Sequence, residues 1–248
     1  MGSRARRHPA PDNVDAMTLT EDLIALCHRD EPDPGPDPQK VAFTDAEFDA
    51  AAAKILTECG PGPVWVFAYG SLIWKPAWRP AQQCRATAHG WHRSFCLEMR
   101  RWRGSPARPG LMMGLREGGH CTGIAQQLDD DLRHSQLVRL LCREIDGPAS
   151  LRWIDVDCDG RMLRALCFYA GPEGVARRAE LPSEEVASIL ARACGHIGSG
   201  AEYLYKTVVA LETHGIRDPH LWQLQHLVAA EIKRAALTLL VSETVPGR

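Results

Sequence analysis

Residues 64–74 read Val-Trp-Val-Phe-Ala-Tyr-Gly-Ser-Leu-Ile-Trp, and they give the first prediction about the fold. The run is apolar, uncharged and rich in β-forming side chains, which predicts a buried strand. Gly70 and Ser71 interrupt it, and a residue without a Cβ allows a sharp turn and the close approach of another group. Such a turn can present backbone N–H groups to an anion or an oxyanion. An ordinary strand end is the alternative reading of these residues.

The composition is that of a folded chain without a dominant charge. Its 248 residues fit one domain with an added segment, or two small domains. Hydrophobic residues make up 45% and charged residues 24%, which is enough for a core and argues against global disorder. With 29 basic and 31 acidic residues, charge gives no reason to expect nucleic acid or a membrane as a partner. No apolar run is long enough to predict a membrane span.

The nine cysteines are scattered singly, and none belongs to a Cys-x-x-Cys motif. This argues against a zinc ribbon or a redox pair. The N-terminal arginines are not followed by an apolar segment, so the sequence shows no secretory signal. We therefore expect reduced thiols in a cytoplasmic protein, packed in the core rather than catalytic. Cys96 and Cys142 would be the exceptions if they lay near a site.

Residues 1–60 are expected to form an N-terminal extension and residues 61–240 the main, catalytic domain. The extension begins with a polar stretch, followed by a short helix from Thr20 and an acidic, proline-rich linker over 30–38. A capping box at Thr44 then predicts a second helix. We expect the extension to lie against the domain and to contribute nothing to the site.

The main domain is predicted to be α+β, with a small mixed or antiparallel β-barrel flanked by helices. Residues 83–98 are predicted to form a strand that bends at Gly90. Two further strands, 111–115 and 121–128, are expected to be joined through two glycines. Residues 128–131 are predicted to open a helix that runs to about Cys142. The predicted hairpin around Asp159-Gly160 and the later helices complete this pattern.

Most familiar catalytic motifs are absent from this sequence: it has no phosphate-binding loop, no nucleophile elbow and no zinc-protease helix. Ser71 as a nucleophile would lack a neighbouring base. His89 and His92 lie in a strand-like run, so a structural or surface role is favoured over a metal site. The basic loop 100–108 has only a local charge, so a loop that covers a substrate or is merely solvated is favoured over a nucleic-acid patch.

Glu144 is the best candidate for a general base. It follows the apolar end of a helix and precedes Gly147-Pro148. A carboxylate there faces the negative end of the helix dipole, and partial burial would raise its pKa further. A raised pKa makes a glutamate a competent base near neutral pH. An exposed glutamate paired with Arg143 is the alternative.

Taken together, these segments resemble the ChaC family of glutathione-specific γ-glutamylcyclotransferases, whose bacterial members were earlier labelled cation transport regulators. The resemblance covers roughly residues 64–230. It rests on residues 66–74, 90–96, 103–104, 109–110, 119–128, 140–141, 143–144 and 195–204. The opening strand combined with a correctly placed Arg143-Glu144 is what makes the resemblance specific.

The resemblance implies a β-barrel core and a lyase reaction that needs neither metal nor cofactor. The α-amine of a γ-glutamyl group attacks its own γ-carbonyl and releases 5-oxoproline, and glutathione would also give cysteinylglycine. Glu144 would be the general acid and base. The resemblance implies that the γ-glutamyl group is held by Ala68, Tyr69, Gly70, Ser71, Leu72 and Ile73, with Tyr203 as a wall or hydrogen-bond donor. The backbone N–H groups at Gly70 and Ser71 would bind oxygen atoms.

Two departures from the family pattern bear on the substrate. Residues 101–104 read Arg-Trp-Arg-Gly where many relatives have Asp-His-Arg-Gly, and Gly200 replaces a helix-opening Asn. Two alternatives therefore stay beside glutathione cleavage: a cyclotransferase for another γ-glutamyl peptide or amine, and a non-catalytic regulatory binding protein. In the leading reading the partner is a small-molecule substrate, with no nucleic acid and no membrane.

Overall fold

The structure is a computed structural model, and it describes residues 16–38, 42–144, 151–171 and 180–244. The helices are α1 (Glu21–Ala25), α2 (Asp45–Cys59), α3 (Ser71–Trp74), α4 (Arg133–Glu144), α5 (Ser183–Arg192), α6 (Gly200–Thr213) and α7 (Pro219–Thr244). The strands are β1 (Trp65–Ala68), β2 (Gln83–Met99), β3 (Gly110–Gln127), β4 (Leu151–Cys158), β5 (Arg161–Phe168), β6 (Cys194–Gly195) and β7 (Gly198–Ser199). Among the described helices, none is long and apolar enough to span a membrane.

Five strands close into a barrel in the order β1-β3-β2-β4-β5. β1 pairs antiparallel with β3 and parallel with β5, so the barrel is mixed, and this expectation is confirmed. All four residues of β1 are buried, which explains why its sequence shows no polar alternation. The parallel pairing brings the carboxyl ends of β1 and β5 to the same end of the barrel.

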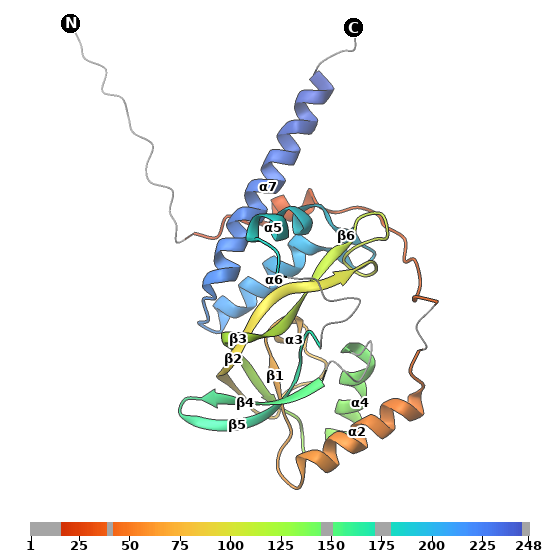
Figure 1. The fold of residues 1–248 in the computed structure, drawn as a ribbon, viewed down its shortest axis with the longest axis vertical. Helices are drawn as coiled ribbons and strands as arrows, with labels where there is room; N and C mark the ends of the chain where they lie inside the picture. Colours follow the sequence, from red (N-terminus) through yellow and green to blue (C-terminus); the bar gives the residue numbers. More distant parts are fainter. Residues whose placement is uncertain (1–15, 39–41, 145–150, 172–179, 245–248) are drawn as a thin grey trace, which may run out of the picture.

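β2 and β3 form one long antiparallel pair that continues beyond the barrel (Figure 1). β2 bends at Gly90 as predicted. The prediction of two strands within residues 111–128 is wrong, because β3 is continuous. Gly118 and Gly119 have positive φ values of 104° and 69° and lie opposite Gly90 between the pairs His89↔His120 and Trp91↔Glu117. The two glycines are thus accommodated as a bulge inside the ladder instead of a turn.

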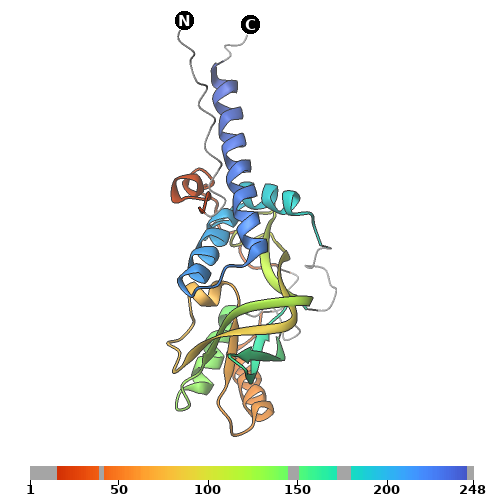
Figure 2. The ribbon, with the colours of Figure 1, turned by 90° about the vertical axis from the view of Figure 1, so that its left-hand side faces the viewer.

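The helices cover the two ends of this long strand pair. α2 and α4 pack beside β1, with Leu137, Leu140 and Leu141 of α4 fully buried there. α5, α6 and α7 pack on the far part of β2 and β3, together with α1. Figure 2 shows α7 rising from this helical end, away from the barrel. The end of β1 lies between the two groups of helices.

Local hydrogen bonds determine where α2 and α4 begin. The capping box predicted at Thr44 is confirmed at the start of α2. α4 begins at Arg133 and not at Asp129, because the Asp129 carboxylate accepts the N–H of Asp131 at 3.0 Å and makes a turn there. α4 continues to Glu144, the last residue described before position 151, so the predicted break at Gly147-Pro148 lies outside the described residues.

Residues 194–199 form a small hairpin from β6 and β7. Ser199 then caps α6, since its Oγ accepts the N–H of Glu202 at 3.1 Å. α6 therefore begins at Gly200, directly after its cap.

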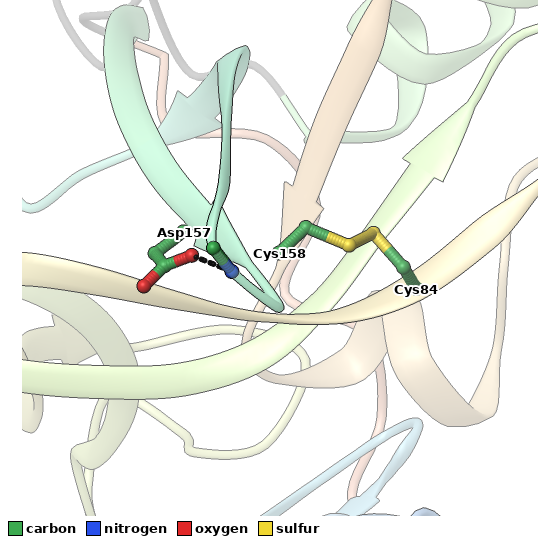
Figure 3. Close-up of a disulfide and its surroundings, with 4 residues drawn as sticks. Cys84, Asp157 and Cys158 are labelled. Atoms are coloured by element: carbon green, nitrogen blue, oxygen red, sulfur yellow. Dashed lines mark hydrogen bonds between the residues drawn. A yellow bond between two sulfur atoms is a disulfide. The ribbon is translucent and has the colours of Figure 1, made fainter.

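The expectation that every cysteine is a free thiol is contradicted by a disulfide between Cys84 and Cys158 (Figure 3). Cys84 lies near the start of β2 and Cys158 ends β4, so the bond crosses the β2–β4 seam of the barrel. The two residues are separated by 74 positions, and only the closed barrel brings them together. The other seven cysteines are free, and five of them are buried.

Candidate active site at the end of strand β1

The backbone turn at Gly70 follows β1 directly and starts the four-residue helix α3. A Cβ placed on Gly70 would lie 2.7 Å from the hydroxyl oxygen of Tyr203. Only glycine leaves room for that hydroxyl, so the glycine predicted to allow a close approach does so for a side chain of α6. Tyr203 is 4% exposed.

The backbone N–H of Ser71 donates to the Tyr203 hydroxyl at 3.3 Å. Ser71 thus meets the other site residues through its main chain. The rings of Trp74 and Phe95 pack edge-on against Tyr203, at 5.8 and 6.0 Å between centroids. These contacts fix the tyrosine ring over the turn.

Arg93 on β2 holds the last carbonyl before the turn. Its Nε donates to the carbonyl of Tyr69 at 2.7 Å, and a second nitrogen donates to the carbonyl of Thr122. A third forms a 2.7 Å ion pair with Asp218, which precedes α7. The Arg93 side chain is only 1% exposed. A buried arginine with three acceptors makes a rigid support for the strand end.

Glu144 reaches the same region from the end of α4. Its carboxylate pairs with Arg143 at 2.8 Å, yet the Glu144 side chain is only 22% exposed. The Arg143 guanidinium also donates to the carbonyl of Lys75, which ties α4 to the residue after α3. The sequence alternative of an exposed, paired glutamate is therefore right about the pairing and wrong about the exposure.

Burial dominates the electrostatics of these side chains. It raises the pKa of Glu144 above 4.5, and the charge of Arg143 opposes this only in part. Burial, together with the negative charge of Glu144, raises the pKa of Tyr203 to about 12. The pKa of Tyr69 is raised well above 10 by burial, by Tyr203 and, to a smaller extent, by Glu144. Near neutral pH both tyrosines keep their protons, and the raised pKa of Glu144 makes its carboxylate a stronger base than an exposed glutamate.

The remaining residues of the predicted binding segment, residues 68–73, contribute in different ways. Ala68 and Leu72 are buried in the core, so their side chains face protein. The Leu72 carbonyl accepts from Gln126 at 3.4 Å. Ile73 is half-buried and lines an open groove between α3 and the outer face of α6. The backbone of residues 68–73 thus approaches the site, while its side chains mostly anchor it.

Arg103 is a neighbour of the site whose position the sequence did not reveal. It is 6% exposed and donates to Glu202 at 2.7 Å and to the Ser199 carbonyl at 2.9 Å. Its guanidinium carbon lies 5.6 Å from the centre of the Tyr203 ring. The only signal in the sequence was its place in the Arg-Gly pair that the family resemblance matched. Arg93 had a clearer signal, since it falls between Trp91 and Phe95 on one face of a strand.

The other sequence candidates stay apart from this cluster. The His92 ring contacts the Gly118 carbonyl at 3.0 Å, in a structural role. Within the described residues, no group of three His, Cys, Asp or Glu side chains could hold a metal ion. Cys96 is buried and Cys142 is exposed.

The arrangement joins a partly buried carboxyl, a protonated tyrosine and a strand-end turn. A carboxyl with a raised pKa can accept and return a proton, and N–H and O–H donors can stabilise a developing oxyanion. The chemistry that fits is proton transfer coupled to attack on a carbonyl.

The chain is similar to several known γ-glutamylcyclotransferases. The chain is 37% identical to the Escherichia coli glutathione-specific γ-glutamylcyclotransferase over 177 residues, which cover 70% of this chain and 77% of that protein. It is 28% identical to the zebrafish glutathione-specific γ-glutamylcyclotransferase 1 over 70% of this chain and 93% of that protein. The crystal structure of the yeast glutathione-specific enzyme shares the fold, with a TM-score of 0.63 at 22% identity, over 68% of this chain and 96% of that one. The model of the ChaC-like protein family matches residues 64–231, well over half of the sequence, and the chain belongs to that family.

Proposed function

We propose that this chain is a γ-glutamylcyclotransferase that cleaves glutathione to 5-oxoproline and cysteinylglycine. The observation that carries the proposal is the partly buried carboxyl of Glu144, whose charge adds to burial in raising the pKa of Tyr203, the residue whose hydroxyl accepts the Ser71 N–H. The names of the E. coli and zebrafish relatives support glutathione as the substrate.

The first step is an intramolecular attack. Glu144 takes a proton from the α-ammonium of the γ-glutamyl group, and the freed amine attacks the γ-carbonyl carbon to close a five-membered ring. No water nucleophile is needed, so the site has only to fold the substrate and exclude competing geometries. The carbonyl oxygen becomes an oxyanion as the new C–N bond forms.

The second step is the collapse of this intermediate. The bond from the former carbonyl carbon to the cysteinyl nitrogen breaks, and protonated Glu144 returns its proton to that leaving nitrogen. The ring nitrogen releases the second of its ammonium protons to solvent, so that the lactam keeps one N–H. The products are 5-oxoproline and the free amine of cysteinylglycine. One carboxyl thus acts first as base and then as acid, which a raised pKa favours.

Gly70, Ser71 and Tyr203 are proposed to bind the reacting group. The Tyr203 hydroxyl keeps its proton because its pKa is about 12, so it can donate to a substrate oxygen while it accepts the Ser71 N–H. The backbone of Ala68, Tyr69, Leu72 and Ile73 would form the wall that holds the γ-glutamyl carbon chain.

We also propose residues 61–240 as the catalytic domain, which the family match over 64–231 supports. A cytoplasmic location is proposed, which the seven free cysteines support and the Cys84–Cys158 disulfide does not. The balanced charge of the chain supports a small molecule, and not nucleic acid or a membrane, as its main partner.

The direct test is to incubate the purified chain with millimolar glutathione and to measure 5-oxoproline and cysteinylglycine in equal amounts. γ-Glutamyl dipeptides without the glycine, and γ-glutamyl amines, serve as competing substrates. Faster release from one of these would move the assignment to another γ-glutamyl compound. No 5-oxoproline from any of them would overturn the proposal.

A further inference from the structure

The segment formed by residues 16–38, here called the strap, crosses the helical end of the molecule before it reaches α2 (Figure 1). It begins against α7, where the side-chain oxygen of Gln225 accepts the N–H groups of Thr18 and Leu19 at 3.0 and 2.9 Å. α1 follows and packs on the same helix. The family match does not include the strap, since it starts at residue 64.

The strap then follows the end of α5 toward the β6–β7 hairpin. The Cys27 thiol contacts the Ala191 carbonyl at 3.2 Å, and the Arg29 side chain donates to the Arg192 carbonyl at 2.6 Å. The Cys194 thiol contacts the Arg29 carbonyl at 3.6 Å. Side-chain and backbone bonds therefore fix the path of the strap over this part of the fold.

Asp33 connects the strap to the basic loop formed by residues 100–108. Its two carboxylate oxygens accept from Nε and a terminal nitrogen of Arg101, both at 2.7 Å. His196, at the tip of the hairpin, lies 3.6 Å from the same carboxylate. A bidentate carboxylate–guanidinium pair fixes the orientation of both groups as well as their separation.

The loop held in this way has an unfavourable backbone. Trp102 has a φ of 61°, which is uncommon for a bulky side chain and persists only where contacts on both sides enforce it. The Trp102 carbonyl accepts the N–H of Ile197 at 3.1 Å. A Cβ on Gly195 would overlap the carbonyl oxygens of Trp102 and Gly104, so loop and hairpin touch at their backbones.

The next residue of the loop reaches the site. Arg103 donates to Glu202 and to the Ser199 carbonyl, and its guanidinium lies against the ring of Tyr203. The Tyr203 hydroxyl in turn accepts the N–H of Ser71. A continuous set of contacts thus joins the strap to the turn after β1.

We propose that Asp33 is a positioning residue for the reaction. By holding Arg101, it keeps residues 101–104 in the conformation that sets Arg103 against Tyr203 and the tyrosine hydroxyl on Ser71. The strap is then a working part of the site, not a covering that lies outside it as the sequence suggested. This inference rests on the proposed function only in the kinetic test, which measures turnover.

The kinetic test compares Asp33→Ala, Arg101→Ala and the double variant. The interaction free energy between two side chains in contact typically corresponds to a factor of about 2 to 150 in a rate. We therefore expect kcat to fall about tenfold in Asp33→Ala, with KM changed less than about twofold. Asp33→Glu should restore most of the loss, and the double variant should be no slower than either single one. Asp30→Ala removes an exposed carboxylate from the same strap and serves as the control.

Amide hydrogen exchange supplies a readout that needs no turnover. In Asp33→Ala, exchange should be faster at residues 101–104, at Ile197 and at Ser71, and unchanged in Asp30→Ala. Faster exchange confined to the strap would overturn the inference, as would Asp33→Ala kinetics equal to those of Asp30→Ala. If the unaltered chain releases no 5-oxoproline from any γ-glutamyl substrate, the proposed function fails, and exchange at Ser71 alone decides the role of Asp33.

Discussion

The hydroxyl of Tyr203 accepts the backbone N–H of Ser71 at 3.3 Å, although 132 positions separate the two residues. This bond brings α6 onto the turn that ends β1. It explains why position 70 is glycine, since a side chain there would meet the same hydroxyl at 2.7 Å. The helical end and the barrel end of the molecule meet at this point, and the proposed chemistry takes place there.

Glu144→Gln removes the proposed base without changing the shape of the side chain. General acid–base catalysis is typically worth about 10²- to 10⁴-fold, so kcat should fall by at least that factor. Release of 5-oxoproline measures the loss, and circular dichroism checks that the variant folds. Glu185→Gln, an exposed carboxylate at the start of α5, should keep the original rate. A Glu144→Gln variant with near-original turnover would remove Glu144 from the mechanism.

The raised pKa of Glu144 predicts how rate and stability depend on pH. As a base it must be deprotonated, so kcat/KM should rise with pH through a midpoint above 4.5, and Glu144→Gln should lose this limb. The Glu144 carboxyl binds its proton more tightly in the folded protein than in the unfolded chain. Stability from this group is therefore complete below pH 4.5 and is lost as the pH rises through the folded pKa.

The stability part of this prediction has its own measurement. The free energy of unfolding of Glu144→Gln should increase relative to that of the original chain as the pH rises from about 4 to about 8. The reason is that the glutamine carries no charge to bury. Denaturant midpoints at the two pH values give the comparison. An equal difference at both values would contradict the raised pKa.

Gly70→Ala and Tyr203→Phe are expected to interact. The new methyl group would lie 2.7 Å from the tyrosine hydroxyl, so Gly70→Ala alone should be destabilised and inactive. In the Tyr203→Phe background the nearest ring carbon is 3.8 Å away, an ordinary contact, so the same change should cost less stability. A double-mutant cycle of unfolding free energies measures the difference. Costs that simply add would show that the hydroxyl does not restrict position 70.

The disulfide between Cys84 and Cys158 should stabilise the barrel by closing a long loop. Cys84→Ala with Cys158→Ala should lower the free energy of unfolding by about 2–4 kcal/mol. The same loss should follow reduction of the original chain, while Cys142→Ala, which removes an exposed thiol, should cost little. Thiol titration of the unfolded chain should find seven thiols before reduction and nine after it. Nine thiols without reductant would contradict the bond.

Local features of the fold could be predicted where neighbouring residues decide them. The β1 strand, the bend at Gly90, the Thr44 capping box and the hairpin after Cys158 depend on side chains and φ preferences within a few positions. The prediction failed at Gly118-Gly119, where the same residue type serves a turn or a bulge and the partner strand chooses between them. It also failed at residues 128–131, where the Asp129 carboxylate accepts the N–H of Asp131 and makes a turn instead of opening a helix.

The sequence by itself determined the buried strand, the glycine at its end and a carboxylate at the end of an apolar helix, because each is written in adjacent residues. Only the tertiary structure decided what surrounds them. The burial that raises the pKa of Glu144, the approach of Tyr203 to Gly70 and the grip of Asp33 on Arg101 all join residues far apart in the chain. Such contacts depend on how the barrel closes and where the helices pack, and no spacing along the sequence reports them.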